Sequence, residues 1–216
     1  AAMSEVFPDL AARTMHVSHG MMRMQSGKMS SRTGNVITGE SLINELAEVA
    51  KGHAAASRAE DTEKLAQEVS VAAIKFQILK GGMSKDITFD RERALSTEGD
   101  SGPYLQYAHA RTNAIIEKAN QAGVVAALSP DASTSELSRL LYRFPEIVAN
   151  AQAALEPHIV ANYLISIASS FNAWYAQEQI LDGTPSAAHK VALTDAVRVT
   201  LKNGLWILGI PAPERM

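Results

Sequence analysis

Two long stretches in the second half of the chain carry apolar residues at helical spacing. The first stretch begins at Pro157, and the second begins at Thr184 and Pro185. Apolar side chains at every third or fourth position share one face of a helix, and two such faces can bury each other. We expect these helices to pack together, with Gly204 permitting a close approach. The expected faces are Val160, Leu164, Ile167, Ala168, Phe171, Trp174 and Tyr175, and Leu193, Ala196, Val197, Thr200, Leu201, Gly204, Leu205 and Leu208.

Three more helices are predicted between residues 101 and 155. Ser101 or Gly102 caps the first, and Pro103 suits its first turn, where a missing amide proton is harmless. Its apolar face is formed by Leu105, Ala108, Thr112, Ile115, Ile116 and Ala119. A capping box of Ser133 with Glu136 predicts a second helix that runs to Tyr142 and breaks at Phe144-Pro145, before a third over residues 146–155.

The first half predicts two helices and little strand. Thr38 caps a helix to about residue 56, and the next spans residues 60–79. Their apolar positions are Leu42, Leu46 and Val49, then Leu65, Val69, Ala72, Ala73 and Phe76. Alternation predicts a short strand pair over residues 15–24, with its turn near Gly20. Residues 84–102, which alternate in polarity at 87–90, are expected to be irregular or to form a short strand.

Glycines and acids at residues 98–102 are typical of a hinge between domains. We therefore expect a mainly α fold in two parts. Residues 1–98 form the first part, with short strands, a polar loop and connecting helices. Residues 99–216 form an all-helical bundle.

Composition narrows the function classes. The 216 residues are 46% hydrophobic, carry a formal net charge of −3 and include no cysteine. We expect no disulfide, no metal site and no membrane span, because thiolates, paired histidine ligands and long apolar runs are missing from the sequence. A soluble cytoplasmic protein is expected. The negative charge disfavours general polyanion binding, so any RNA contact must be local.

The polar loop at residues 26–36 has the composition of a phosphate clamp. Its glycines let the backbone approach a ligand, its hydroxyls and amides can donate to phosphate, and Lys28 and Arg32 can offset negative charge. The competing interpretation is a solvated hairpin tip.

A second candidate site lies on the helix that begins near Ser101. Tyr104, Tyr107 and Arg111 are spaced so that two rings and a guanidinium share one face. Aromatic rings stack on bases and arginine pairs with phosphate or base edges, which suits RNA. The alternative is that the tyrosines are buried at a domain interface and Arg111 pairs with an acid such as Asp100.

The loop resembles the KMSKS signature of class I aminoacyl-tRNA synthetases. The segment GPYLQYAHAR at residues 102–111 and the closing runs at residues 201–205 and 213–216 resemble arginyl-tRNA synthetases in particular. The resemblance covers nearly the whole chain. It implies that the HIGH motif and the arginine pocket belong to an upstream part, since His16-Val17-Ser18-His19-Gly20 has its letters in a different order. The chain is expected to be the carboxyl-terminal portion of such an enzyme, inactive alone.

The resemblance assigns roles in the loop. Lys28 would hold the departing pyrophosphate, Ser30 and Ser31 would offer hydroxyls or amides, and Met29 would complete the ATP contact. The family places a second lysine at the position of Ser31, so Arg32 is the candidate replacement cation. ATP, Mg²⁺ and arginine are the expected ligands of the full-length arginine–tRNA ligase.

The resemblance also implies tRNA-Arg as partner of a monomeric protein. It places Tyr175 and Met216 at the anticodon, and it favours an RNA contact for Arg111. Alternatively, Tyr175 completes the core and Met216 is a frayed end. A non-catalytic tRNA-binding module, a helical protein-interaction scaffold and a cysteinyl-type synthetase are the other functions considered.

Overall fold

The computed structural model describes the chain except residues 1, 25–37, 55–58, 60 and 131. The described part contains ten helices and a two-stranded sheet, which confirms the mainly α fold. The elements are α1 (Ala2–Val6), α2 (Pro8–Ala12), β1 (Met22–Met24), α3 (Gly39–Ala54), α4 (Thr62–Leu79), β2 (Ile87–Phe89), α5 (Arg91–Leu95), α6 (Gly102–Gln121), α7 (Glu136–Tyr142), α8 (Phe144–Ala154), α9 (His158–Gln177) and α10 (Ala187–Ile207).

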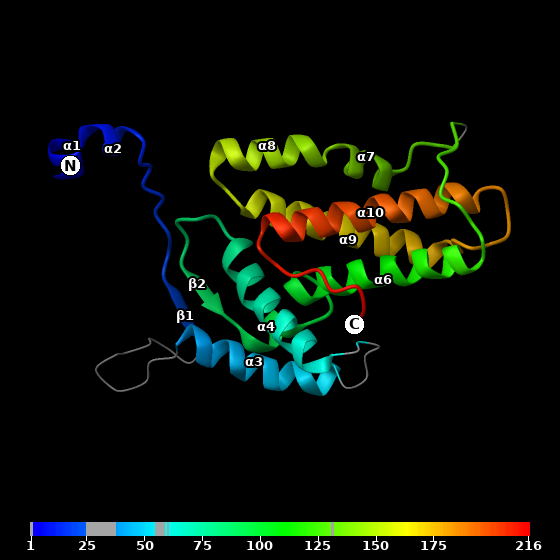
Figure 1. The fold of residues 1–216 in the computed structure, drawn as a ribbon, viewed down its shortest axis with the longest axis horizontal. Helices are drawn as coiled ribbons and strands as arrows, with labels where there is room; N and C mark the ends of the chain where they lie inside the picture. Colours follow the sequence, from blue (N-terminus) through cyan, green and yellow to red (C-terminus); the bar gives the residue numbers. More distant parts are fainter. Residues whose placement is uncertain (1, 25–37, 55–58, 60, 131) are drawn as a thin grey trace.

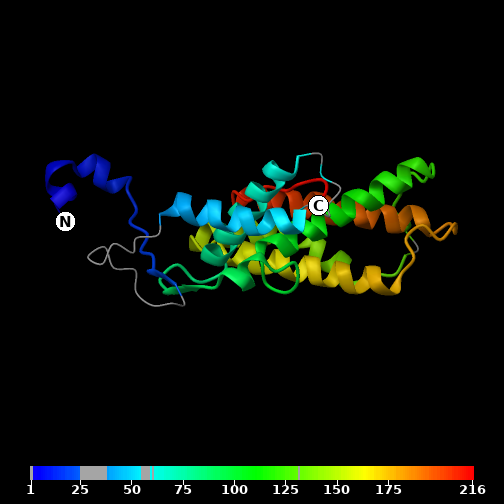
Figure 2. The same ribbon diagram turned by 90° about the horizontal axis from the view of Figure 1, so that it is seen from below.

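The bundle is built around α6, α9 and α10, with α7 and α8 on the side of α9 and α10 away from α6 (Figure 1). The largest apolar cluster joins these helices through fully buried leucines such as Leu105, Leu164 and Leu201. Ala72 and Phe76 of α4 belong to the same cluster. The core therefore continues from the bundle into α4, and the division between residues 98 and 99 stays a prediction. Figure 2 shows α1 and α2 lying apart from this body.

The expected packing of α9 against α10 is confirmed at Gly204. A Cβ added to Gly204 would lie 2.4 Å from Leu164 Cδ2, so only glycine lets the two helices come this close. The buried faces follow the predicted spacing, except that Tyr175 and Ala196 are exposed. Helical periodicity thus identified this contact, because both faces are long and regular.

The amino end of α6 also agrees with expectation. The Ser101 hydroxyl accepts from the Tyr104 amide at 3.0 Å, and Pro103 lies in the first turn. In α3 the Thr38 hydroxyl accepts from the Ser41 amide at 3.0 Å, which confirms the predicted cap. Val49 was wrongly placed in the core of α3. It is 51% exposed, because Ala47 and Ala50 occupy the buried face instead.

The predicted strand pair over residues 15–24 is wrong. Only β1 forms there, and it pairs in parallel with β2, with Met22 opposite Ile87 and Met24 opposite Phe89. The Asp86 carboxylate accepts from the Met21 amide at 2.9 Å and fixes this register. A parallel partner so far along the chain leaves no signal in local alternation.

Two short helical features also differ from the sequence prediction. The cap of α7 is Ser135, whose hydroxyl accepts from the Ser138 amide at 3.1 Å, and not Ser133. The choice between neighbouring serines depends on backbone angles rather than on composition. In addition, α5 begins after Asp90, which caps it at the Arg93 amide, where an irregular segment or a strand was expected.

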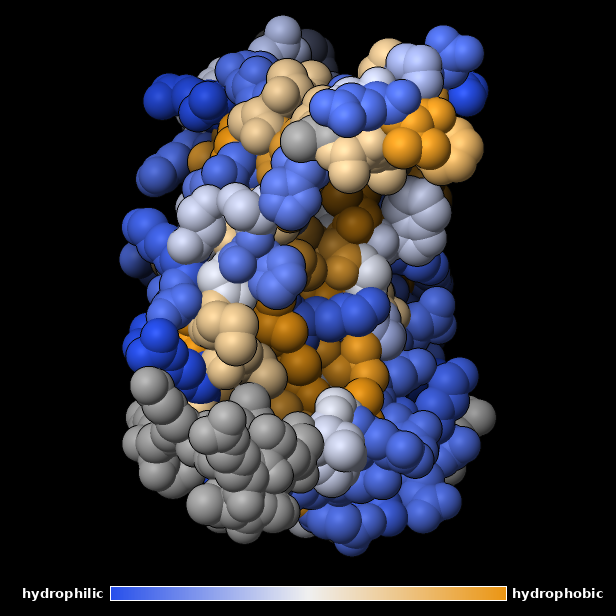
Figure 3. Space-filling model, turned by 90° about the vertical axis from the view of Figure 1, so that its left-hand side faces the viewer, coloured by the Kyte–Doolittle hydropathy of each residue, from blue (hydrophilic) through white to orange (hydrophobic). Residues whose placement is uncertain are grey.

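An apolar hollow lies on the face shown in Figure 3. Its volume is about 620 Å³, and its walls include Val17, Met83, Leu155 and Ile207. Among the predicted site residues that the structure describes, none lines it. In the part of the chain that the structure describes, no helix is long and apolar enough to cross a membrane.

Candidate nucleic-acid interface

The first candidate site, formed by Lys28, Met29, Ser30, Ser31 and Arg32, lies outside the described residues. The phosphate-clamp interpretation of this loop stays a prediction. The second candidate site is described in full, and its residues come from α6, α9 and the carboxyl-terminal tail.

Arg111 of α6 lies against two tyrosine rings. Its guanidinium carbon is 4.8 Å from the centre of the Tyr107 ring and 5.5 Å from the centre of the Tyr175 ring. A cation at such distances over a ring face is attracted by the ring's quadrupole. The helical spacing of Tyr107 and Arg111 accounts for the first contact, and the end of α9 brings Tyr175 to the second. The structure therefore brings three predicted site residues together.

Asn172 of α9 is a member of this cluster that sequence reasoning missed. Its Oδ1 accepts from Arg111 Nη1 at 2.6 Å, and its Nδ2 donates to the Tyr104 hydroxyl at 3.0 Å. The hydrogen-bond partner of Arg111 is thus an amide and not an acid such as Asp100. Asn172 lies three residues before Tyr175, one helical turn away on the same face, and that spacing is the signal that could have identified it.

The rings of Tyr107 and Tyr175 are accessible to solvent, whereas hydrogen bonds fix the side chains of the other members of the cluster. Tyr107 is 39% exposed and Tyr175 is 38% exposed. Tyr175 stacks on the buried ring of Phe171, with centroids 6.0 Å apart and an interplanar angle of 19°. Tyr104 is half-buried and packs against the main core. The arrangement presents two supported aromatic surfaces beside a guanidinium whose side chain is fixed.

Met216 lies in the groove next to this cluster. The groove has a volume of about 490 Å³, and Tyr107, Arg111 and Met216 all line it. The Met216 thioether therefore lies near the tyrosine and the arginine. The interpretation of Met216 as a frayed end is not supported, since its side chain is half-buried in the groove wall.

The charge of the groove is mixed. Arg111, Lys118 and Arg215 contribute cations to its walls, and Glu117 and Glu214 contribute acids. Arg215 pairs with Glu117 at 3.0 Å, and both side chains are about half exposed. A wall with both signs does not attract polyanions in general, so binding here must rely on stacking and on local contacts.

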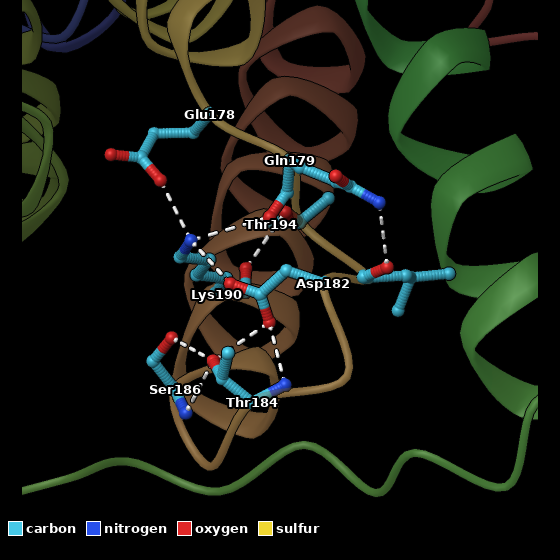
Figure 4. A network of polar contacts seen from close by, with 8 residues as sticks. Glu178, Gln179, Asp182, Thr184, Ser186, Lys190 and Thr194 are labelled. Atoms are coloured by element: carbon cyan, nitrogen blue, oxygen red, sulfur yellow. Dashed lines mark hydrogen bonds and ion pairs between the residues drawn. The ribbon is translucent and has the colours of Figure 1, made fainter.

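A polar network closes the loop that follows Tyr175 (Figure 4). Lys190 of α10 donates to Glu178 at 2.7 Å and to Asp182 at 3.0 Å. The Asp182 carboxylate also accepts from the Thr184 amide at 2.9 Å and from the Thr184 hydroxyl at 2.8 Å. These bonds tie the start of α10 to the end of α9, close to the aromatic cluster.

The network predicts a pH dependence of stability. The Thr184 amide, then its hydroxyl, then Lys190 lower the pKa of Asp182 from 3.8 to about 2. A depressed folded-state pKa stabilises the fold above the unfolded value, and this contribution is lost as the pH falls through about 2. In Asp182→Asn, the free energy of unfolding should fall less steeply over this range than in wild type. Urea unfolding at a series of acidic pH values measures both slopes, and equal slopes would contradict the prediction.

The described residues offer no cluster of three or more histidine, aspartate and glutamate side chains that could hold a metal ion. His109 is fully buried, and burial lowers its pKa, which favours the neutral ring. A neutral ring has one nitrogen that donates a hydrogen bond and one that accepts.

Comparison with known proteins gives one consistent family. A model described as DALR anticodon binding domain matches residues 105–216. Over its whole length the chain is 36% identical to an arginine–tRNA ligase of Lactococcus lactis subsp. cremoris and 37% identical to one of Streptococcus pneumoniae, and it spans 39% of the length of each. The structure of Thermus thermophilus arginyl-tRNA synthetase superposes with a TM-score of 0.84 at 32% identity, covering 96% of this chain and 36% of that one.

A more distant structure agrees in fold. The arginyl-tRNA synthetase of Plasmodium falciparum superposes with a TM-score of 0.70 at 23% identity. The match covers 97% of this chain and 38% of that one. Similarity at this level of identity supports the helical architecture alone.

Proposed function

The chain belongs to the DALR anticodon-binding domain family, and we propose that it is the tRNA-binding, carboxyl-terminal portion of an arginine–tRNA ligase. The relatives that it matches over its full length carry that name, and the chain spans 39% of their length. The proposed partner is tRNA-Arg. The protein is proposed to be monomeric and cytoplasmic. The anticodon occupies the groove between α6 and the carboxyl-terminal tail, and Tyr175 of α9 lies beside Arg111 in its wall.

One observation carries this proposal: the Arg111 guanidinium is held between two accessible rings, those of Tyr107 and Tyr175. Single-stranded RNA is recognised by stacking of splayed bases on aromatic rings, with hydrogen bonds to base edges or phosphates. Phe171 supports one ring from below, and Asn172 fixes the guanidinium. The cluster is thus organised before any base arrives, which lowers the entropic cost of binding.

The proposed reaction of the longer protein is ATP-dependent activation of arginine, followed by transfer to tRNA. The arginine carboxylate attacks the α-phosphate of ATP and displaces pyrophosphate to give an adenylate, and the terminal ribose hydroxyl of the tRNA then displaces AMP. The protein therefore contributes positioning and charge stabilisation rather than a nucleophile. Lys28, Ser30 and Ser31 are proposed to contact ATP, with Mg²⁺ accompanying its phosphates. Arg32 is proposed to supply the cation that Ser31 does not. The chemistry requires the upstream part, so this chain alone is expected to bind tRNA without catalysis.

A helical protein-interaction scaffold is the second candidate, because one observation favours it. Tyr104 and Arg111 are half-buried and both hydrogen-bond to Asn172, as expected if they served only to join α6 to α9. The exposure of Tyr107 and Tyr175 favours the RNA function instead. A scaffold predicts no affinity for tRNA-Arg.

The affinity of the chain for tRNA-Arg tests the proposal, measured against the same tRNA with its middle anticodon base replaced, at two salt concentrations. We expect the cognate tRNA to bind about tenfold more tightly, or about 1.4 kcal/mol. The preference should persist at the higher salt concentration, since base contacts depend less on counterion release than phosphate contacts. Equal and salt-sensitive binding to both RNAs would mean that the chain holds only the backbone. Absence of binding would favour the scaffold.

A further inference from the structure

The carboxyl-terminal tail, residues 209–216, leaves α10 in a fixed direction. Gly209 has a φ of 64°, a left-handed conformation that favours glycine, and the Ile210 amide donates to the Leu205 carbonyl at 2.8 Å. Ile210 is 2% exposed and joins the main core. These contacts turn the chain away from α10 and send it across α6 toward the groove (Figure 1).

Two polar side chains of α6 are completely buried beneath this tail. Gln106 donates through Nε2 to the Pro211 carbonyl at 2.9 Å and to the Glu68 carbonyl of α4 at 3.2 Å. His109 Nδ1 lies 2.9 Å from the Pro213 carbonyl. A carbonyl can only accept, so Nδ1 carries the proton in this bond. Buried polar groups without partners are costly, and here both point their donors at the tail backbone.

Asn113, one turn further along α6, also contacts His109. Its Nδ2 lies 3.3 Å from both ring nitrogens and donates to the His109 carbonyl at 3.2 Å. The hydrogen bond of Nδ1 to the Pro213 carbonyl, at 2.9 Å, is the shortest of these ring contacts. Beyond Pro213, Arg215 of the tail forms an ion pair with Glu117 that is about half exposed and contributes little by itself.

The carbonyls that accept these hydrogen bonds, those of Pro211 and Pro213, lie a few residues before Met216 in the sequence. Met216 lines the groove with Arg111 and Tyr107. We propose that Gln106 and His109 are positioning residues, which clamp the tail so that Met216 completes the anticodon groove. This inference rests on the proposed function and extends it: buried side chains on one face of α6 set the shape of the site on its other face. They act through the tail and contact no RNA themselves.

Substitutions at His109 distinguish a role that depends on its hydrogen bond to the Pro213 carbonyl from one that depends only on filling space. In His109→Asn the side-chain amide nitrogen can take the place of Nδ1 and still donate to Pro213, whereas His109→Leu fills space without a donor. Gln106→Met is the second variant, nearly equal in shape and also without a donor. We expect His109→Leu and Gln106→Met to weaken binding of tRNA-Arg about fivefold to tenfold, and His109→Asn to stay within about twofold of wild type.

A double-mutant cycle with deletion of Met216 provides the decisive readout. If His109 acts through the tail, His109→Leu combined with the deletion should bind no more weakly than the deletion alone. Additive losses, or equal losses in His109→Asn and His109→Leu, would overturn the inference. Carboxypeptidase release of Met216 reports on the tail without RNA: it should be faster in His109→Leu and Gln106→Met than in wild type and His109→Asn. Equal rates would likewise overturn the clamp, whereas failure of wild type to bind tRNA-Arg would overturn the proposed function instead.

Discussion

Phe171→Ala should lower the free energy of unfolding by about 3–5 kcal/mol, the usual cost of emptying a fully buried aromatic site. Phe171 is 0% exposed and lies in the main core. Its ring also supports Tyr175 at 6.0 Å and Trp174 at 6.1 Å between ring centres. Removal of the ring therefore opens a cavity below the aromatic cluster as well as destabilising α9. Urea unfolding monitored by circular dichroism measures the change.

Phe7→Ala is the matched control for this prediction. Phe7 is 59% exposed, next to the short helices at the start of the chain. Its removal should change the free energy of unfolding by no more than about 0.5 kcal/mol. Similar losses for the two phenylalanines would contradict the assignment of the core to the interior of the bundle.

Arg111→Ala should weaken binding of tRNA-Arg by about 10-fold to 100-fold, since an arginine that contacts a base contributes about 1–3 kcal/mol. The variant loses the ring contacts and the hydrogen bond to Asn172 together. Arg111→Lys keeps the charge but lacks the planar group that lies on the rings, so we expect it to recover little of the affinity. Equilibrium binding to labelled tRNA measures all three proteins.

Arg139→Ala is the control for charge. Arg139 is exposed on α7, outside the groove, and its substitution removes the same formal charge. It should lower the affinity by no more than about twofold, since one distant cation contributes only to long-range attraction. If Arg111→Ala and Arg139→Ala had equal effects, the groove would have no special role.

Much of the bundle could be predicted because its helices repeat apolar residues over many turns. The periods of α9 and α10 identified their contact, and the spacing of Tyr107 and Arg111 predicted a shared face that the structure confirms. Such features depend on residues close together in the sequence. Their roles in tRNA binding stay predictions, and so do those of the loop residues from Lys28 to Arg32.

The features that could not be predicted depend on partners far apart in the sequence. Residues 22–24 and 87–89 form a parallel ladder that neither strand reveals alone. Gln106 and His109 bind backbone carbonyls of the tail, and a carbonyl is the same in every residue. Asn172 was missed because its two partners lie on another helix, although its helical spacing to Tyr175, which family resemblance suggested, could have identified it. Tertiary hydrogen bonds, unlike helical faces, have no period.

The most direct test of an anticodon groove centred on Arg111 is a double-mutant cycle that combines a substitution in the protein with a base change in the tRNA. Wild type and Arg111→Ala are each titrated with tRNA-Arg and with the same tRNA carrying a changed middle anticodon base. The groove predicts a 10-fold to 100-fold loss from the substitution on the cognate tRNA, and a loss within about twofold on the changed tRNA, where the contact is already broken. An equal loss on both RNAs would contradict it, because Arg111 would then contact the backbone and leave the anticodon unread.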